Sequence, residues 1–229
     1  MCIRDRGYSA LQNNTTASNN TAVGYQAGYS NTTGSPIDAF GYQSLYYNTT
    51  GSANAAFGLN SLKSNTTGGS NSAFGFQALQ NNTTASNNTA VGYQAGYTNS
   101  TGAQLTAIGY QSLYYSTAGR NTALGYQAAY TTSTGTYNTS LGWQAGVYTT
   151  TGNANTAVGD SAMSANTTGG QNVAIGMQAL VSNTTASNNT AVGYQAGYSN
   201  TTGGNSTFIG FQAGYSSTAT NSIGIGYQA

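Results

Sequence analysis

The sequence predicts an all-β chain: a parallel β-solenoid of about 13 repeats, each 17 residues long. Three observations lead to this prediction: a glycine recurs at a nearly constant interval, an apolar residue precedes it, and turn-forming residues separate these segments. A helix pair with its turn needs about 30 residues, so this period is too short for a helical solenoid. No window has the sustained apolar spacing of three and four residues that an amphipathic helix requires.

The recurring glycine, called here the anchor glycine, usually follows an apolar residue and precedes an aromatic residue and a glutamine. Eleven of the 13 intervals between successive anchors are 17 residues long, and the other two are 16. An identical stretch at 13–29 and 81–97 indicates that duplication built the array. The anchors are Gly7, Gly24, Gly41, Gly58, Gly75, Gly92, Gly109, Gly125, Gly142, Gly159, Gly176, Gly193, Gly210 and Gly226.

Each repeat has two segments that can form strands and two that can form corners. We expect two short strands per turn, each of about four to six residues. Corners are expected at Asn-Thr-Thr-Gly and at Gly-x-Asn, where turn residues and positive φ angles are favoured. Stacked turns would then pair edge to edge, so that equivalent residues form columns.

The columns indicate which residues face inward. Three residues after each anchor the side chain is Ala or Ser, as at Ala27 and Ser44, which suits a narrow interior or a close contact between chains. The next column alternates mainly between Leu and Gly. The residue before the anchor is always apolar from the second repeat on, and we expect this column to be core. Its members are Val23, Phe40, Phe57, Phe74, Val91, Ile108, Leu124, Leu141, Val158, Ile175, Val192, Ile209 and Ile225.

Two further columns hold the candidate functional and structural residues. The residue after the anchor is mostly aromatic but is Asp160 in one repeat, so we expect this column to reach a surface or an interface. The candidate ligand or interface aromatics are Tyr25, Tyr42, Phe76, Tyr93, Tyr110, Tyr126, Trp143, Tyr194 and Phe211. The next residue is glutamine in most repeats, and stacked amides can bond along the axis as a structural ladder. Its members are Gln26, Gln43, Gln77, Gln94, Gln111, Gln127, Gln144, Gln178, Gln195 and Gln212.

Charged residues are too few and too scattered for most chemistry. The chain has no histidine and only three acidic residues, so neither paired acid–base groups nor a metal-ligand cluster can be assembled. We therefore expect no catalytic residues, no metal, no cofactor and no enzyme activity. With a net charge of +1, no basic run and no long apolar run, nucleic acid and membrane insertion are not expected either. The charged residues are Arg4, Asp5, Arg6, Asp38, Lys63, Arg120 and Asp160.

The first six residues differ from the rest of the chain. They hold three of the seven charged residues and the single cysteine, Cys2, and nothing like them recurs. Met-Cys-Ile-Arg-Asp is similar to the translation of a transposon-end adapter used in preparing sequencing libraries. We therefore expect residues 1–6 to be a non-native segment on an assembled environmental fragment, with a short native leader as the alternative. Residues 7–229 form the repeat array, which we expect to be a fragment of a longer fibre.

Two known groups of proteins have similar motifs. Residues 172–176 (NVAIG) and 221–226 (NSIGIG) resemble the signature of head repeats in YadA-like trimeric autotransporter adhesins. The arrays of Asn-Thr-Ala-x-Gly-Tyr-Gln-Ala-Leu are also similar to the repeat regions of phage-type tail fibres. The autotransporter head repeat is shorter than the repeat of this chain. The resemblance implies a left-handed β-roll, a homotrimer, and display outside a cell or virion with a glycan or host surface receptor as a possible partner.

Three functions remain open from the sequence. In the first, the repeats are a passive spacer that sets length. In the second, the array is adhesive, because aromatic ladders would offer flat apolar faces with hydroxyl rims to sugars or proteins. The third is an ice-binding solenoid, which the Thr-Thr pairs suggest only weakly, because adjacent residues point to opposite faces and leave one Thr row. The many Asn-x-Thr sequons, such as the one at Asn48, are interpreted as turn chemistry instead of glycan acceptors.

Overall fold

The structure is a computed structural model that describes residues 3–229; residues 1 and 2 lie outside the described part. The chain divides into an N-terminal unit that ends at residue 119 and a C-terminal unit from residue 120 to 229. Each unit is an all-β parallel solenoid, as the sequence predicts. The described residues contain no helix with the length and apolar character needed to span a bilayer.

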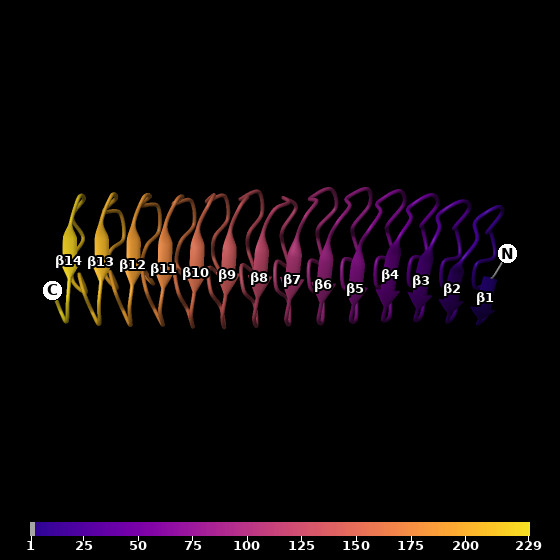
Figure 1. Ribbon diagram of the computed structural model, residues 1–229, viewed down its shortest axis with the longest axis horizontal. Coiled ribbons are helices and arrows are strands. Elements are labelled where there is room, and N and C mark those ends of the chain that lie inside the picture. The colour runs from indigo at the N-terminus through magenta and orange to yellow at the C-terminus, as the bar shows by residue number, and fades with distance from the viewer. Residues whose placement is uncertain (1–2) are drawn as a thin grey trace. The chain divides into compact units, whose positions relative to one another are not determined.

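In the N-terminal unit, each strand pairs in parallel with the strand one repeat further along the chain (Figure 1). The register advances by one repeat per strand, so that Ala22 pairs with Ala39 and Ala73 pairs with Ala90. Equivalent residues of successive repeats therefore stack in columns. The strands are β1 (Ile3–Arg6), β2 (Asn20–Val23), β3 (Ile37–Phe40), β4 (Asn54–Phe57), β5 (Ser72–Phe74), β6 (Thr89–Val91) and β7 (Thr106–Ile108).

The C-terminal unit has the same arrangement (Figure 1). Ala157 pairs with Ala174, which pairs in turn with Ala191. The 16-residue repeat keeps this register, because Ile209 pairs with Ile225. The strands are β8 (Thr122–Leu124), β9 (Thr139–Leu141), β10 (Thr156–Val158), β11 (Val173–Ile175), β12 (Thr190–Val192), β13 (Thr207–Ile209) and β14 (Ile223–Ile225).

The prediction of two strands per turn is wrong: each described repeat has one strand of three or four residues. After the strand, residues with positive φ alternate with ordinary ones; in the turn after β2, φ is 52° at Gln26 and 60° at Gly28. This alternation curls the backbone, so the segment cannot be an extended strand. Hydrogen bonds between turns continue there, since the N–H of Gln43 donates to the carbonyl of Tyr25 at 2.9 Å.

The prediction that the apolar column before the anchor is core is also wrong. In β2 the buried residues are Asn20 and Ala22, whereas Thr21 and Val23 point outward and are partly exposed. Other members of the column are similarly placed, and Leu124 is 48% exposed. Because side chains alternate along a strand, burying the column of Ala22 turns the column of Val23 outward. The interior accepts the small residues, and the larger apolar residues lie on the outer face of the sheet.

Large and small residues alternate through the interior of each unit. Gly96 lies where a Cβ atom would be 2.9 Å from Leu79 and 3.4 Å from Leu105. In the C-terminal unit, a Cβ atom on Gly197 would be 2.8 Å from the ring of Phe208, which is itself buried. The Leu/Gly column is therefore a packing column, in which glycine occurs where a neighbouring turn supplies the larger side chain.

A column of buried asparagines forms a second interior ladder. Asn48 donates from Nδ2 to Oδ1 of Asn31 at 2.8 Å, and Asn65 donates in the same way to Asn48 at 2.7 Å. In the C-terminal unit, Asn183 donates to Asn166 at 2.9 Å. All five side chains are fully buried. These amides bond to one another along the axis, so most of the polar groups in the interior are paired. Two exceptions are Oδ1 of Asn183 and Nδ2 of Asn189, which are buried without a hydrogen-bond partner.

The backbone of residues 3–6 follows the same ladder as the repeats. Ile3 pairs with Asn20, and Arg6 pairs with Val23. This pairing concerns backbone conformation; the non-native origin of residues 1–6 stays a prediction. Within that segment, Met1 and Cys2 lie outside the described residues.

Candidate functional site

The candidate aromatic residues form stacked ladders on the surface of each unit. The rings of Tyr25 and Tyr42 are 5.1 Å apart between centroids with an interplanar angle of 9°. Phe76 and Tyr93 are 5.2 Å apart at 5°. About two-fifths of each side chain remains exposed. The remaining candidates, which are also exposed and stack on a ring of the same unit, are Tyr110, Tyr126, Trp143, Tyr194 and Phe211.

This stacking changes what the ladders present to a ligand. Nearly parallel rings about one strand spacing apart cover each other's faces. Their exposed surface consists of ring edges and phenol hydroxyls, not the flat apolar faces expected from the sequence. A ring face is left open where the column is interrupted, because there the neighbouring turn supplies no ring.

Three repeats have no aromatic residue in this column, at Leu59, Asp160 and Met177. In the N-terminal unit, Leu59 takes the place of an aromatic residue and is 40% exposed. In the C-terminal unit, Asp160 follows Trp143 in the column and is exposed. The repeats of Leu59 and Asp160 also replace the ladder glutamine, with Asn60 and Ser161 respectively, whereas Met177 is followed by Gln178. At Leu59 and Asp160, two adjacent columns are therefore interrupted at once.

The glutamine amides are bonded from turn to turn. In each bonded pair the later glutamine donates from Nε2 to Oε1 of the glutamine one repeat earlier, and every candidate glutamine has φ between 50° and 57°. Such a φ is costly for a residue with a side chain, and the bonds between turns help to offset the cost. The bonded pairs are Gln26–Gln43 (2.9 Å), Gln77–Gln94 (2.7 Å), Gln94–Gln111 (3.0 Å), Gln127–Gln144 (3.2 Å), Gln178–Gln195 (2.8 Å) and Gln195–Gln212 (2.8 Å).

A second tyrosine column, four residues after the first, was not among the candidate residues. Tyr29 and Tyr46 stack at 5.1 Å, and Tyr46 meets Tyr47 edge to face at 4.6 Å. Burial raises the pKa of Tyr46, and the nearby phenols of Tyr29 and Tyr47 raise this pKa further. Tyr114 in the same column has its pKa raised for the same reasons. This column could have been found from the sequence, because tyrosine is frequent four residues after the aromatic column.

The outer face of each sheet is a second surface that sequence reasoning missed. It carries the column of Val23 and, two residues earlier, a column that is mostly threonine. Phe40, Phe57 and Phe74 stack along this face at 4.6 and 4.8 Å between ring centroids. Phe74 is 40% exposed and Val91 is 39% exposed. We call this surface the outer apolar strip; it consists of the residues that precede the anchor glycines, from Val23 on in the N-terminal unit and from Leu124 on in the C-terminal unit.

At the Asn-Thr-Thr corners, the hydroxyl of the first threonine forms a hydrogen bond to the next turn. The hydroxyl of Thr49 donates to the carbonyl of Thr66 at 3.1 Å, whereas Thr50 is exposed. One free threonine row therefore runs along this corner. Sequon asparagines such as Asn48 are buried in the asparagine ladder, which leaves no room for a glycan on their amides.

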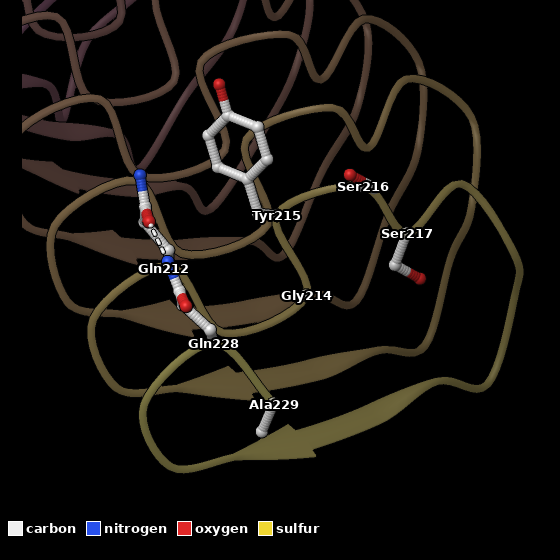
Figure 2. A pocket seen from close by; sticks show the side chains of 7 residues that line it. All are labelled: Gln212, Gly214, Tyr215, Ser216, Ser217, Gln228 and Ala229. Carbon is white, nitrogen blue, oxygen red and sulfur yellow. Dashed lines mark hydrogen bonds between the residues drawn. The ribbon is translucent and has the colours of Figure 1, made fainter.

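A hollow of about 640 Å³ lies over the last described turn (Figure 2). Figure 2 shows the amides of Gln212 and Gln228 projecting side by side, joined by a hydrogen bond of 2.9 Å. One turn earlier the equivalent surface is covered, since Tyr198 stacks on Tyr215 at 4.8 Å. No charged side chain lines this hollow. Its lining residues are Gln212, Gly214, Tyr215, Ser216, Ser217, Gln228 and Ala229.

The described residues contain no group of three or more His, Cys, Asp or Glu side chains placed to hold a metal ion. Comparison of the chain with protein-family models, curated proteins and solved structures gives no match. The surfaces of the solenoid therefore supply the argument about function.

Proposed function

We propose that this chain is a structural or adhesive segment of a fibre displayed on a cell or virion surface. The observation that carries the proposal is the outer apolar strip, which runs through successive turns of each unit without a polar residue. Soluble monomers rarely expose a contiguous apolar patch of this kind. A partner surface that covers the strip would remove it from water.

The partner we propose for the strip is a second and a third copy of the same chain. The residues that flank the strip are uncharged in most repeats, so identical chains can approach without like-charge repulsion. A homotrimer is also what the resemblance to YadA-like head repeats implies. In such an assembly the strip would be internal, and the aromatic ladder would stay outside.

The aromatic ladder is the proposed receptor-facing surface. Its exposed edges carry phenol hydroxyls at a regular spacing along each unit, as at Tyr25 and Tyr42. Hydroxyls next to apolar ring edges can both donate and accept hydrogen bonds, which suits a glycan or a polar host surface. A passive spacer would share the outer apolar strip but would have no need of this ladder.

The test is the molar mass of the protein in solution, from light scattering coupled to gel filtration. Three chains per particle would support the proposed assembly, and a single chain would contradict it. The adhesive role is tested by replacing Tyr25, Tyr42 and Tyr93 together with alanine. A receptor-facing ladder predicts an unchanged molar mass and lost adhesion to host glycans or cells; dissociation would instead place these tyrosines between chains.

Ice binding is the second candidate function, and the outer face of the sheet favours it. There a column that is mostly threonine, and includes Thr89 and Thr106, runs parallel to the outer apolar strip. A row of hydroxyls therefore lies beside a row of apolar side chains on one surface. Thermal hysteresis at micromolar protein would support this function over adhesion. Its absence, together with a trimeric mass, would leave the fibre proposal standing.

A further inference from the structure

The interruption at Asp160 leaves an unfilled position in the aromatic ladder of the C-terminal unit. Trp143 and Asp160 are adjacent members of one column, because the N–H of Ser161 donates to the carbonyl of Trp143 at 2.9 Å. Met177 is the next member, because the N–H of Gln178 donates to the carbonyl of Asp160 at 2.9 Å. The carboxylate is shorter than a ring, so the outer part of this turn is open between Trp143 and Met177.

Different kinds of side chain form the two sides and the floor of this gap. One face of the Trp143 indole stacks on Tyr126, at 6.1 Å between centroids and 9° between planes, so its other face is turned toward the gap. Trp143 is 49% exposed and Met177 is 47% exposed. On the floor, Ser161 donates to Oδ1 of Asp160 at 2.7 Å. Within the described residues, Oδ2 of that carboxylate has no hydrogen-bond partner.

We propose that this gap binds the guanidinium group of an arginine side chain from a partner polypeptide. Successive turns are about 4.8 Å apart, so the gap is one planar group thick. A guanidinium is planar, stacks on aromatic faces, and donates a fork of hydrogen bonds to a carboxylate. It would occupy the missing position on the indole face of Trp143 and bond to Asp160. A neutral ring could fill the space but would leave the carboxylate unpaired.

The same unit already places a guanidinium over an aromatic ring. Arg120 and Tyr137 are equivalent residues of successive turns, 17 positions apart. The guanidinium carbon of Arg120 lies 5.3 Å from the ring centroid of Tyr137, and its Nη1 donates to the tyrosine hydroxyl. The spacing between turns is therefore compatible with one guanidinium stacked on the ring of the neighbouring turn, which is the arrangement proposed at Trp143.

The interruption in the N-terminal unit does not have these features. In the N-terminal unit the missing ring is replaced by Leu59, which is apolar and offers no charge to a cation. Asp160 is the only carboxylate among residues 120–229 apart from the chain terminus. An aromatic face beside a carboxylate therefore occurs at one position of the C-terminal unit, whether or not the fibre as a whole is adhesive.

The experiment follows the single tryptophan of the chain by nuclear magnetic resonance. N-acetyl-arginine methylamide is titrated into the ¹⁵N-labelled full chain at low ionic strength, and the indole N–H signal of Trp143 is recorded. The neutral analogue N-acetyl-citrulline methylamide is the matched ligand control. We expect a saturable shift with the arginine compound and binding at least about fivefold weaker for the citrulline compound, because a cation on an aromatic face beside a carboxylate is favoured.

Two variants separate the contributions of charge and space. Asp160→Asn keeps the shape and removes the charge, so we expect binding at least about fivefold weaker. Asp160→Tyr restores the common residue of the column and fills the gap, so we expect no saturable shift. Equal binding of the arginine compound by Asp160→Asn, equal shifts with the citrulline compound, or no saturable shift in the unchanged chain would each overturn the proposal.

Discussion

Single residues hold this solenoid together through contacts that repeat from turn to turn. The asparagine ladder is the clearest case, because Asn65 is fully buried and bonded on both sides along the axis. It donates to Asn48 and accepts from Asn82 at 2.9 Å. A polar side chain is stable in this interior only because the adjacent turns supply its partners.

Asn65→Ala should therefore lower the free energy of unfolding. The change leaves Oδ1 of Asn48 and an amide hydrogen of Asn82 without their ladder partner, at a cost of about 1–3 kcal/mol. Urea unfolding followed by circular dichroism measures the loss. Thr67→Ala, at an exposed position of the same corner, is the control and should change stability by less than about 0.5 kcal/mol. Equal effects of the two variants would contradict the role of the ladder.

The anchor glycine is required by the approach of the next turn. A Cβ atom on Gly142 would lie 2.5 Å from the carbonyl oxygen of Gly159, and φ at Gly142 is 135°. Gly226 has a similar φ of 128°, but there the nearest atom to a Cβ is 3.8 Å away. A comparison of Gly142 with Gly226 therefore distinguishes a clash with the backbone from the strain of the φ angle itself.

We expect Gly142→Ala to be more destabilising than Gly226→Ala by about 1–3 kcal/mol, the usual cost of forcing extra atoms into a packed site. Thermal unfolding of the two variants, compared with the unchanged chain, gives the difference. If both variants lose the same stability, the φ angle and not the close approach explains why glycine recurs.

At the scale of the repeat, the interior is filled by complementary choices in neighbouring columns. Phe208 occupies a position that is alanine in most repeats, and the turns on either side carry Gly197 and Gly214 next to its ring. Elsewhere a leucine in the glycine column faces an alanine. The packing volume is thus shared between turns.

Phe208→Ala should cost about 3–5 kcal/mol, because it leaves a cavity beside two glycines. Gly214→Leu added to Phe208→Ala should recover part of that loss, since it recreates the Leu and Ala combination of the other repeats. Gly214→Leu alone should be destabilising because the ring of Phe208 occupies the space. A double-mutant cycle by urea unfolding tests the coupling; additive effects would contradict shared packing.

Ionisation of the second tyrosine column, which contains Tyr46 and Tyr114, should limit the stability of the fold at high pH. Burial, and then the neighbouring phenols, raise the pKa of Tyr46 above its ordinary value of 10.0. An acid whose pKa is higher in the folded state keeps its full stability below its unfolded pKa and loses it as pH rises beyond that value. The melting temperature should therefore decrease as the pH rises above about 10.

Tyr46→Phe with Tyr114→Phe should make this alkaline loss smaller, because neither ring can then ionise. Circular dichroism melts at pH 8, 10 and 11 compare the double variant with the unchanged chain. The same fall in melting temperature for both proteins would show that other groups set the alkaline limit.

At the scale of the whole molecule, the surface and not the interior distinguishes the proposed assembly from an isolated solenoid. The outer apolar strip lies on a sheet whose side chains are half-exposed, so burying it against other chains would gain about 25 cal/mol per Å² of apolar surface. The interior columns are already packed within each unit and would gain nothing from association.

Replacing Phe57, Phe74 and Val91 with threonine should therefore dissociate the assembly while the fold is retained. Threonine is favoured in strands and is already common on this face, so the sheet should tolerate it. Light scattering should give a single chain, and the far-ultraviolet spectrum should be unchanged. The matched control replaces Thr50, Thr67 and Thr84 with serine and should keep the original mass. A trimer in both variants would exclude the strip as the interface.

The sequence by itself determined the repeat, the parallel stacking and the columns. A strict 17-residue period with a glycine anchor allows few other structures, and the register Ala22–Ala39 follows from it directly. The sequence also predicted the narrow interior, because a column restricted to Ala and Ser, such as the column of Ala27 and Ser44, indicates that there is little space for its side chains. These features depend on spacing and side-chain size, which sequence records.

Only the tertiary structure decided which columns face inward. Val23 was expected to be core because it is apolar, yet it lies on the outer face. The polar Asn20 is buried instead, because bonds to the neighbouring turn satisfy its side-chain amide. The single strand per turn depended on positive φ at residues such as Gln26, which propensity does not predict. In both cases the deciding contacts are with the neighbouring turn, and these exist only once the chain has stacked.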